Sequence, residues 1–495
     1  MSTVPDSDAE AIASDILRST DAGGQVARGG LIRGAGYLVG VGAGFATSVL
    51  LLRHLGVADY GRYGAIAALM GLVLGITDGG MTAIGTREVS VLPAGRKREQ
   101  LASSLMTLRA LAAMLGVVIA IGFAWIFYGP FLALGAALVG ISVVLQSSQA
   151  MATVPLLADL RAAPIAAFDL VRQVLTLLGV LVLVVVGANL LPFFSLQIPV
   201  VAIVLTATLL YVRRSFALGF SFHRPHLAHL LRETLPMSIA VVLNSLYLGA
   251  MVVIVSLLTD DIETGTYAAP ARIMDVLVFL AATMISMAIP VLAVAGAEDR
   301  ARFRSGLQLL LQSGLVAAAA ITVGLIAAAP QLMTLIGGAQ FADSAVVLQI
   351  QSVALIGIFA NQALQFALVT LRAQRRLIYA NAVALAMLLA AGFTLVPMLG
   401  PEGGAIAVII GEAVLTLGLA VALVRTDHSC APSITFAIRL LASAVVPVAV
   451  IVVFHTGWIT AMVAVALFVV AAVIFGAIPR EAIRALLPVR GSSPR

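Results

Sequence analysis

Charged residues are scarce in this chain of 495 residues: they make up 11% of it, whereas soluble domains average about 25%. Hydrophobic residues reach 61%, and the mean hydropathy is +1.10. A water-soluble fold has too little interior to cover that much apolar surface. The composition therefore excludes a soluble protein.

Other absences exclude further classes. The single cysteine, Cys430, excludes an internal disulfide. The chain has no P-loop, which argues against ATP hydrolysis, and its connecting segments lack the acid pairs of membrane glycosyltransferases. No metal-ligand set or cofactor motif is found either. We therefore expect neither an enzyme nor a protein with a resident metal or cofactor.

The apolar residues that dominate the chain form a series of long runs. A helix needs about 20 residues to cross a bilayer core of about 30 Å. These runs are apolar on every side, whereas strands of a membrane barrel alternate apolar and polar residues. We predict an all-α membrane protein of about 14 transmembrane helices, at residues 30–52, 62–86, 103–128, 131–157, 166–188, 191–212, 236–258, 267–295, 306–329, 344–370, 377–398, 403–424, 436–454 and 458–478.

Arginine is concentrated in alternate connecting segments, and short segments rich in Arg and Lys stay in the cytoplasm. Examples are Arg96, Lys97 and Arg98, whereas the segment at residues 259–265 carries Asp260, Asp261 and Glu263. The pattern predicts a plasma membrane protein with both termini in the cytoplasm. The sequence pI of about 9.9 indicates contact with anionic membrane lipids and not with nucleic acid.

Two short sequences occur twice. Residues 59–65 return as residues 263–269 in the pattern acid-x-Gly-x-Tyr-small-Ala, 204 positions later (263 minus 59), and residues 157–162 return as residues 368–373. Both matches pair helix n with helix n+6, which predicts two parallel six-helix lobes related by an axis along the membrane normal. The predicted parts are a cytoplasmic tail (1–29), an N-lobe (30–212), an inter-lobe loop (213–235), a C-lobe (236–425), two final helices (426–478) and a cytoplasmic tail (479–495).

The spacing of small, Pro and Arg residues resembles that of a known family. The residues concerned are Leu55-Gly56, Asp59-Tyr60-Gly61-Arg62-Tyr63, Thr77-Asp78-Gly79-Gly80, Leu235-Pro236, Gly265, Tyr267, Arg272, Pro290, Gly337-Gly338, Leu371-Arg372-Ala373, Val396-Pro397 and Gly403-Gly404. Over residues 30–425 the chain is similar to Wzx-type polysaccharide flippases of the multidrug/oligosaccharidyl-lipid/polysaccharide exporter superfamily. The resemblance implies alternating-access movement of an isoprenoid-pyrophosphate-linked oligosaccharide to the outer leaflet of a bacterial membrane. It also implies an ion gradient or the membrane potential as the driving force and polysaccharide polymerase machinery as a further partner.

A diphosphate group calls for guanidinium donors, and three arginines are expected inside helices: Arg33, Arg109 and Arg272. The resemblance favours Arg272 most. The alternative for each is that the side chain snorkels to the nearer membrane surface.

Carboxylates inside a bilayer need a partner, a proton or a cavity. Those expected are Asp78, Asp275 and Glu412, which are our candidates for coupling to H⁺ or Na⁺. Asp275 is three residues from Arg272, so an internal ion pair is the plain alternative. Glu412 is the leading proton candidate, and its alternative is a protonated residue that only packs.

Amide side chains in the fourth helix of each lobe could bind sugar hydroxyls. The candidates are Gln149, Asn361 and Gln365, but amides also join helices to one another, and this second interpretation is favoured. Three alternative functions stay open: a multidrug antiporter of the same superfamily, a facilitator-type sugar or drug carrier, and a non-transporting scaffold for glycan assembly.

Overall fold

The computed structural model describes residues 20–93, 95–219, 224–298, 300–428 and 433–478, and within these ranges it contains helices and no strand. Ten of the described helices are long and apolar enough to cross a membrane. This confirms the predicted all-α membrane fold, while the total of about 14 spans stays a prediction.

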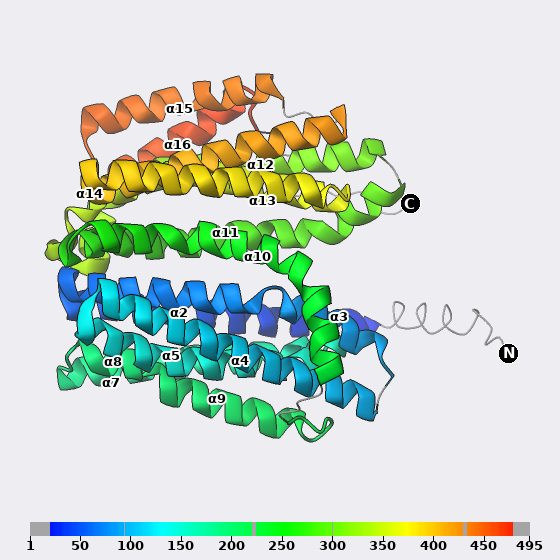
Figure 1. The fold of residues 1–495 in the computed structure, drawn as a ribbon. Coiled ribbons are helices and arrows are strands. Elements are labelled where there is room, and N and C mark those ends of the chain that lie inside the picture. The colour runs from blue at the N-terminus through cyan, green and yellow to red at the C-terminus, as the bar shows by residue number, and fades with distance from the viewer. Residues whose placement is uncertain (1–19, 94, 220–223, 299, 429–432, 479–495) are drawn as a thin grey trace.

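The helices divide into two halves, seen one above the other in Figure 1. The first half contains α2 (Thr20–Asp78), α3 (Met81–Val91), α4 (Arg96–Phe127), α5 (Gly129–Ala152), α6 (Val154–Ala158), α7 (Ala162–Val186), α8 (Leu190–Ser195) and α9 (Gln197–Val212). The second contains α10 (Arg224–Leu258), α11 (Asp261–Glu298), α12 (Arg300–Gly337), the 3₁₀ turn η1 (Ala339–Phe341), α13 (Ser344–Thr370) and α14 (Gln374–Thr426). Two last helices, α15 (Ile434–Phe454) and α16 (Trp458–Ile474), pack on α12 at the edge of the second half.

Two of the expected loops are single-residue bends. Residues 53–61 are helical apart from Gly56 (φ 73°, ψ 178°), and residues 399–402 are helical apart from Gly400 (φ 59°, ψ −138°). Only glycine adopts such angles readily, so one residue folds each long helix back on itself. We call the end of the bundle that carries these two bends the bend end.

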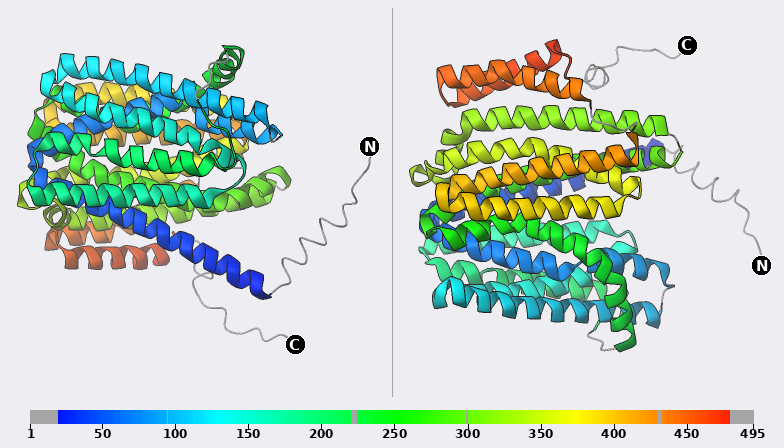
Figure 2. Two further views of the ribbon diagram at one scale, coloured as in Figure 1. Left: turned by 90° about the horizontal axis from the view of Figure 1, so that it is seen from below. Right: turned by 45° about the horizontal axis from the view of Figure 1, so that its top comes forward.

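Other predicted boundaries also differ from the structure. Helix α2 begins at Thr20, ten residues before the predicted span, and the remainder of the predicted N-terminal tail lies outside the described residues, as does the tail at residues 479–495. Helix α10 begins at Arg224, so much of the expected inter-lobe loop is helical; its first turns bend away from the rest of α10 (Figure 2). Apolar content alone predicted the spans, and polar helical turns beyond the apolar run escape that criterion.

The second sequence repeat occurs at equivalent helix ends, but one residue out of register. Leu160 (φ 57°) and Arg372 (φ 56°) both adopt the left-handed conformation after a helix, and the N–H of the next residue returns to a carbonyl five positions earlier, 2.8 Å away, in each copy. This is the Schellman type of helix end. The two caps are 212 residues apart (372 minus 160), whereas the matching letters are 211 apart (368 minus 157).

Apolar cores fill each half and also join the halves. One core in the second half includes Met251, Leu364 and Leu388. A different core, at the bend end, combines Leu52 and Tyr60 of α2 with residues of α11, α12, η1 and α13. The halves are therefore packed tightly against each other at the bend end.

Candidate transport site

A cavity of about 630 Å³ lies between the two halves. Both arms of α2 line it, together with α10 and α11, and the walls are completed by residues of α7, α9, α13 and α14. Ser48, before the Gly56 bend, and Ala67, after it, face the same space. The bend thus brings two parts of one helix to a single cavity.

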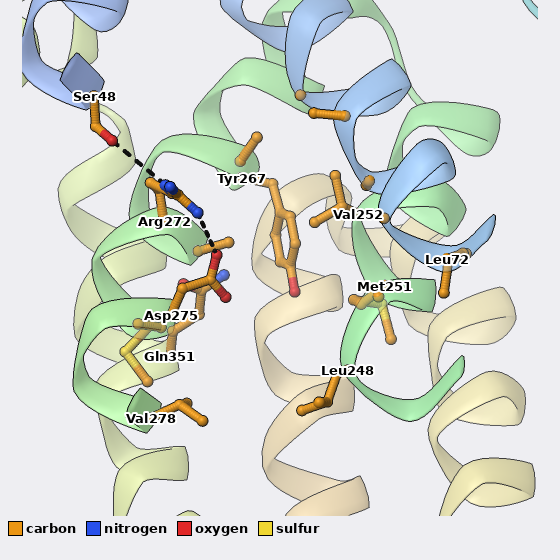
Figure 3. Close-up of a pocket in the computed structure, with 18 of the residues that line it drawn as sticks. Ser48, Leu72, Leu248, Met251, Val252, Tyr267, Arg272, Asp275, Val278 and Gln351 are labelled. Atoms are coloured by element: carbon orange, nitrogen blue, oxygen red, sulfur yellow. Dashed lines mark hydrogen bonds and ion pairs between the residues drawn. The ribbon is translucent and has the colours of Figure 1, made fainter. Parts of the chain in front are cut away.

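One wall of this cavity is polar and centres on Arg272 of α11. Its Nη1 lies 3.4 Å from Asp275 Oδ2, and its Nε donates to Ser48 Oγ over 3.4 Å (Figure 3). Residues three apart on a helix share a face, as the sequence predicted for this pair. The two side chains remain 53% and 67% exposed. Exposed pairs contribute only about 0–1 kcal/mol, so Arg272 can exchange Asp275 for another anionic partner at little cost.

The opposite wall is apolar. Leu72 of α2 and Met251 and Val252 of α10 face the polar wall across the cavity, and the ring of Tyr267 stands between them (Figure 3). A molecule bound here would contact charged and hydrogen-bonding groups on one side and hydrocarbon on the other. That division suits an amphiphile.

Glu412 of α14 lines the same cavity and is 6% exposed. Asn361 of α13 donates from Nδ2 to Glu412 Oε2 over 2.6 Å, and the hydroxyl of Tyr247 of α10 lies close to the carboxylate. Gly357 permits this approach of α13, because a Cβ at that position would lie only 2.8 Å from Glu412 Cβ. Within the described part of the chain, this carboxylate accepts a hydrogen bond from Asn361 and contacts no cationic side chain.

Arg109 and Asp78 form a separate pair that does not line the cavity. Arg109 is 2% exposed, its Nη1 lies 3.4 Å from Asp78 Oδ1, and its Nη2 donates to the carbonyl oxygen of Leu74 over 3.0 Å. Thr82 also donates to Asp78 Oδ1, over 2.6 Å. The pair holds α4 against α2 inside the first half.

The two glutamine candidates also lie away from the cavity lining: Gln149 is buried in α5, and Gln365 is half-buried in α13. Arg33 belongs to α2, but its side chain is outside those described. Of the predicted site residues, the structure therefore brings together Arg272, Asp275 and Glu412, with Asn361 behind Glu412.

Tyrosines are the cavity residues that the sequence reasoning missed. Tyr63 and Tyr267 both line the cavity, and each is the tyrosine of one copy of the repeated acid-x-Gly-x-Tyr pattern. The repeat itself was thus a signal for them. Tyr247 and Gln351, which also line the cavity, belong to no repeated pattern found in the sequence.

The fold is that of a known class of membrane transporters. It is similar to the structure of lipid II flippase MurJ in an inward closed conformation, with a TM-score of 0.76 and 15% identity over 92% of this chain and 100% of that one. It is also similar to an inward-facing multidrug resistance MATE family transporter of the MOP superfamily, with a TM-score of 0.57 and 14% identity over 78% of this chain and 94% of that one. A MOP superfamily transporter from Pyrococcus furiosus gives a TM-score of 0.54 and 15% identity, over 80% of this chain and 93% of that one.

The family is defined by the sequence. Residues 26–295 match the model of the polysaccharide biosynthesis protein family, and the chain belongs to that family. No curated protein sequence matches it significantly. The chain is thus a multi-pass membrane protein of a polysaccharide biosynthesis family with a transporter fold.

Proposed function

We propose that the protein is a flippase that moves isoprenoid-pyrophosphate-linked oligosaccharide units from the inner to the outer leaflet of the bacterial plasma membrane. It would act by alternating access and supply units for a cell-surface polysaccharide, with both of its termini in the cytoplasm. The observation that carries the proposal is the two-walled cavity between the halves. Membership in a polysaccharide biosynthesis family supports the glycan, and the shared fold supports movement between leaflets.

The polar wall would bind the head of such a substrate. The guanidinium of Arg272 offers a planar fork of donors that matches phosphate oxygens. A bound diphosphate would replace Asp275 as its partner, because the present contact of 3.4 Å is long and exposed. Ser48 and Gln351 could then hydrogen-bond to sugar hydroxyls, while hydrocarbon next to the diphosphate would contact Met251 and Val252.

Glu412 is our proposed coupling site, and its surroundings favour H⁺ over Na⁺. Sodium is a hard cation that needs several oxygen ligands around it, as the related hard cations do. The carboxylate is instead contacted by the amide N–H of Asn361 and approached by the Tyr247 hydroxyl. A buried carboxylate that lacks a cation partner can stay in a membrane by taking up a proton.

A multidrug or cation antiporter is the second candidate, and a specific observation favours it. Two carboxylates, Asp275 and Glu412, and the rings of Tyr63 and Tyr267 line the cavity, and such groups also attract organic cations. A scaffold for a glycan assembly complex, which would contact the polymerase machinery without transport, is the third.

The deciding experiment compares cells that lack the protein with cells that express it or a variant. The flippase predicts three results on deletion: a lipid-linked glycan accumulates in the inner leaflet, surface polysaccharide is lost, and export of cationic dyes is normal. The variant Arg272→Gln should reproduce the glycan defect, whereas Arg214→Gln, which changes an exposed arginine away from the cavity, should not. Impaired dye export with normal glycans would overturn the flippase in favour of the antiporter. If Arg272→Gln fully restored surface polysaccharide in the deletion strain, Arg272 would not be part of the substrate site.

A further inference from the structure

The two copies of the repeated pattern, residues 59–65 in α2 and 263–269 in α11, meet face to face at the bend end. A Cβ on Gly61 would collide with the carbonyl oxygen of Asp261 and lie 2.7 Å from the backbone N of Gly265. A Cβ on Gly265 would collide in turn with the carbonyl oxygen of Val57. One turn further, a Cβ on Gly64 would lie 2.9 Å from Ala268 Cβ. The repeated small residues therefore form a mutual helix crossing between the two halves.

An ion pair spans this crossing. Arg62 Nε lies 2.7 Å from Asp261 Oδ2 in the other half, and Arg62 Nη1 lies 2.9 Å from Asp59 Oδ1 in its own half. Arg62 is held by both acids, so its guanidinium clamps the first turn of α11 to the second arm of α2. The three side chains are about 40% exposed, so the clamp can open without burying an unpaired charge.

The crossing is also the end wall of the cavity. Gly64 and Ala268 line the cavity, as do Tyr63 and Tyr267 of the same two segments. Next to the crossing, the rings of Tyr60 and Phe341 meet in a T-shaped arrangement, with centroids 6.1 Å apart, inside the apolar core that joins the halves. While these backbones touch, the cavity is closed at this crossing.

We propose that the paired repeats, residues 59–65 and 263–269, are the gate of the carrier at the bend end, with Gly61 and Gly265 as the seal and Arg62 as its latch. This rests on the proposed alternating access, because a carrier must separate its halves at one end to release what it has bound. Backbone contact at the glycines allows a tight closed state without interlocked side chains. Such an interface separates as two rigid helices. Opening breaks the Arg62–Asp261 pair and leaves Arg62 bound to Asp59, so the latch is reset when the halves return.

A reversible cross-link tests the gate. In a Cys430→Ser background, the pair Gly64→Cys and Ala268→Cys would join the two halves at the crossing. The matched control is Ala380→Cys with Gly418→Cys, where a Cβ on Gly418 would lie 3.2 Å from Ala380 Cβ, inside one half. We expect oxidation to reduce flipping of lipid-linked oligosaccharide in vesicles at least tenfold for the first pair, with recovery on reduction, and to leave the control pair active. Continued flipping by the fully cross-linked first pair would overturn the gate and leave the flippase intact.

A labelling experiment tests the gate without reference to any substrate. The thiol of the Ala268→Cys variant is treated with a membrane-impermeant maleimide in intact cells. We expect Arg62→Asp to raise the labelling rate at least about twofold, because it removes the ion pair across the crossing and places a second acid beside Asp261, and the added Asp261→Arg change to restore the rate. An unchanged rate in the Arg62→Asp variant would refute the latch. If the parent protein flips no glycan but these rates change as expected, the proposed function fails and the gate stands.

Discussion

Replacement of Glu412 by glutamine isolates what the buried carboxylate contributes to energy coupling. Glutamine has nearly the same size, and its side-chain oxygen can still accept from Asn361 Nδ2, which is 2.6 Å from Glu412 Oε2. The variant therefore loses the capacity to bind and release a proton and little else. We expect Glu412→Gln to fold with at least the thermal stability of the parent protein, since a neutral amide costs less to bury than a carboxylate.

The expected size of the effect follows from the number of free carboxylates. The described cavity lining contains two acids, Asp275, whose side chain is exposed, and Glu412, which is buried; the proposed cycle assigns its one proton to the buried Glu412. One proton moving down one pH unit releases about 1.36 kcal/mol, which supports a tenfold difference in substrate concentration between leaflets. For the parent protein we therefore expect the substrate concentrations in the two leaflets to differ about tenfold per pH unit. For Glu412→Gln we expect the two concentrations to be about equal.

The assay uses purified protein in vesicles that contain a lipid-linked oligosaccharide, with the membrane potential clamped at zero. A pH step of one unit is applied, and the exposed glycan is measured with an impermeant modifying reagent. The control Asp275→Asn should flip more slowly but keep the pH response, because its carboxylate is not the one that titrates in the proposed cycle. A tenfold ratio retained by Glu412→Gln, or lost only in Asp275→Asn, would refute proton coupling through Glu412.

Three further substitutions test the framework around the site by thermal unfolding in detergent. Arg109→Met should lower the free energy of unfolding by about 1–3 kcal/mol, because Asp78 loses its charged partner, and the added Asp78→Asn change should restore part of that stability. No recovery in the double variant would show that the ion pair contributes nothing to stability. Gly56→Ala should lower the free energy of unfolding by about 1–3 kcal/mol, because alanine is strained at φ 73° and ψ 178°. The control Gly122→Ala, with no atom within 4 Å of the new methyl group, should be neutral or stabilising. Equal melting temperatures of the two variants would mean that alanine is not strained at the bend. Asn361→Leu should cost about 1.5–3 kcal/mol at neutral pH by removing the donor to a buried carboxylate, and an unchanged midpoint would show that this bond is not stabilising.

The class of fold could be predicted because membrane helices are recognised by their length and apolar content. The connections could not be predicted in the same way. The expected loop at residues 53–61 contains polar residues such as Arg53 and His54, yet these continue the helix and bind the carbonyl oxygens of Leu335 and Ala188. A hydropathy criterion assigns such polar residues to a loop, because it does not take into account the hydrogen-bond partners that the tertiary structure supplies.

The site divides in the same way between local and distant pairings. Arg272 and Asp275 are three residues apart on one helix, so their contact follows from helix geometry alone. Asn361 and Glu412 are 51 residues apart, and Arg109 and Asp78 lie on different helices that meet only in the folded first half. The sequence identified each of these residues as polar within a membrane helix. It could not show that Arg272 and Asp275 face the cavity, whereas Arg109 and Asp78 pack beside it.

Helix geometry, applied to the repeated pattern, predicts which of its residues face a neighbouring helix and which face away. Successive residues on a helix are separated by about 100°, so positions three apart share a face and positions two apart point in nearly opposite directions. Small residues stand three apart in both copies, at Gly61 and Gly64 and at Gly265 and Ala268, and small residues on one face allow helices to approach closely in a membrane. The tyrosine two positions after each glycine must then face away from that contact, and both tyrosines line the cavity. The partner of each small face remained unknown from the sequence, because only the arrangement of the two halves brings one copy of the pattern against the other.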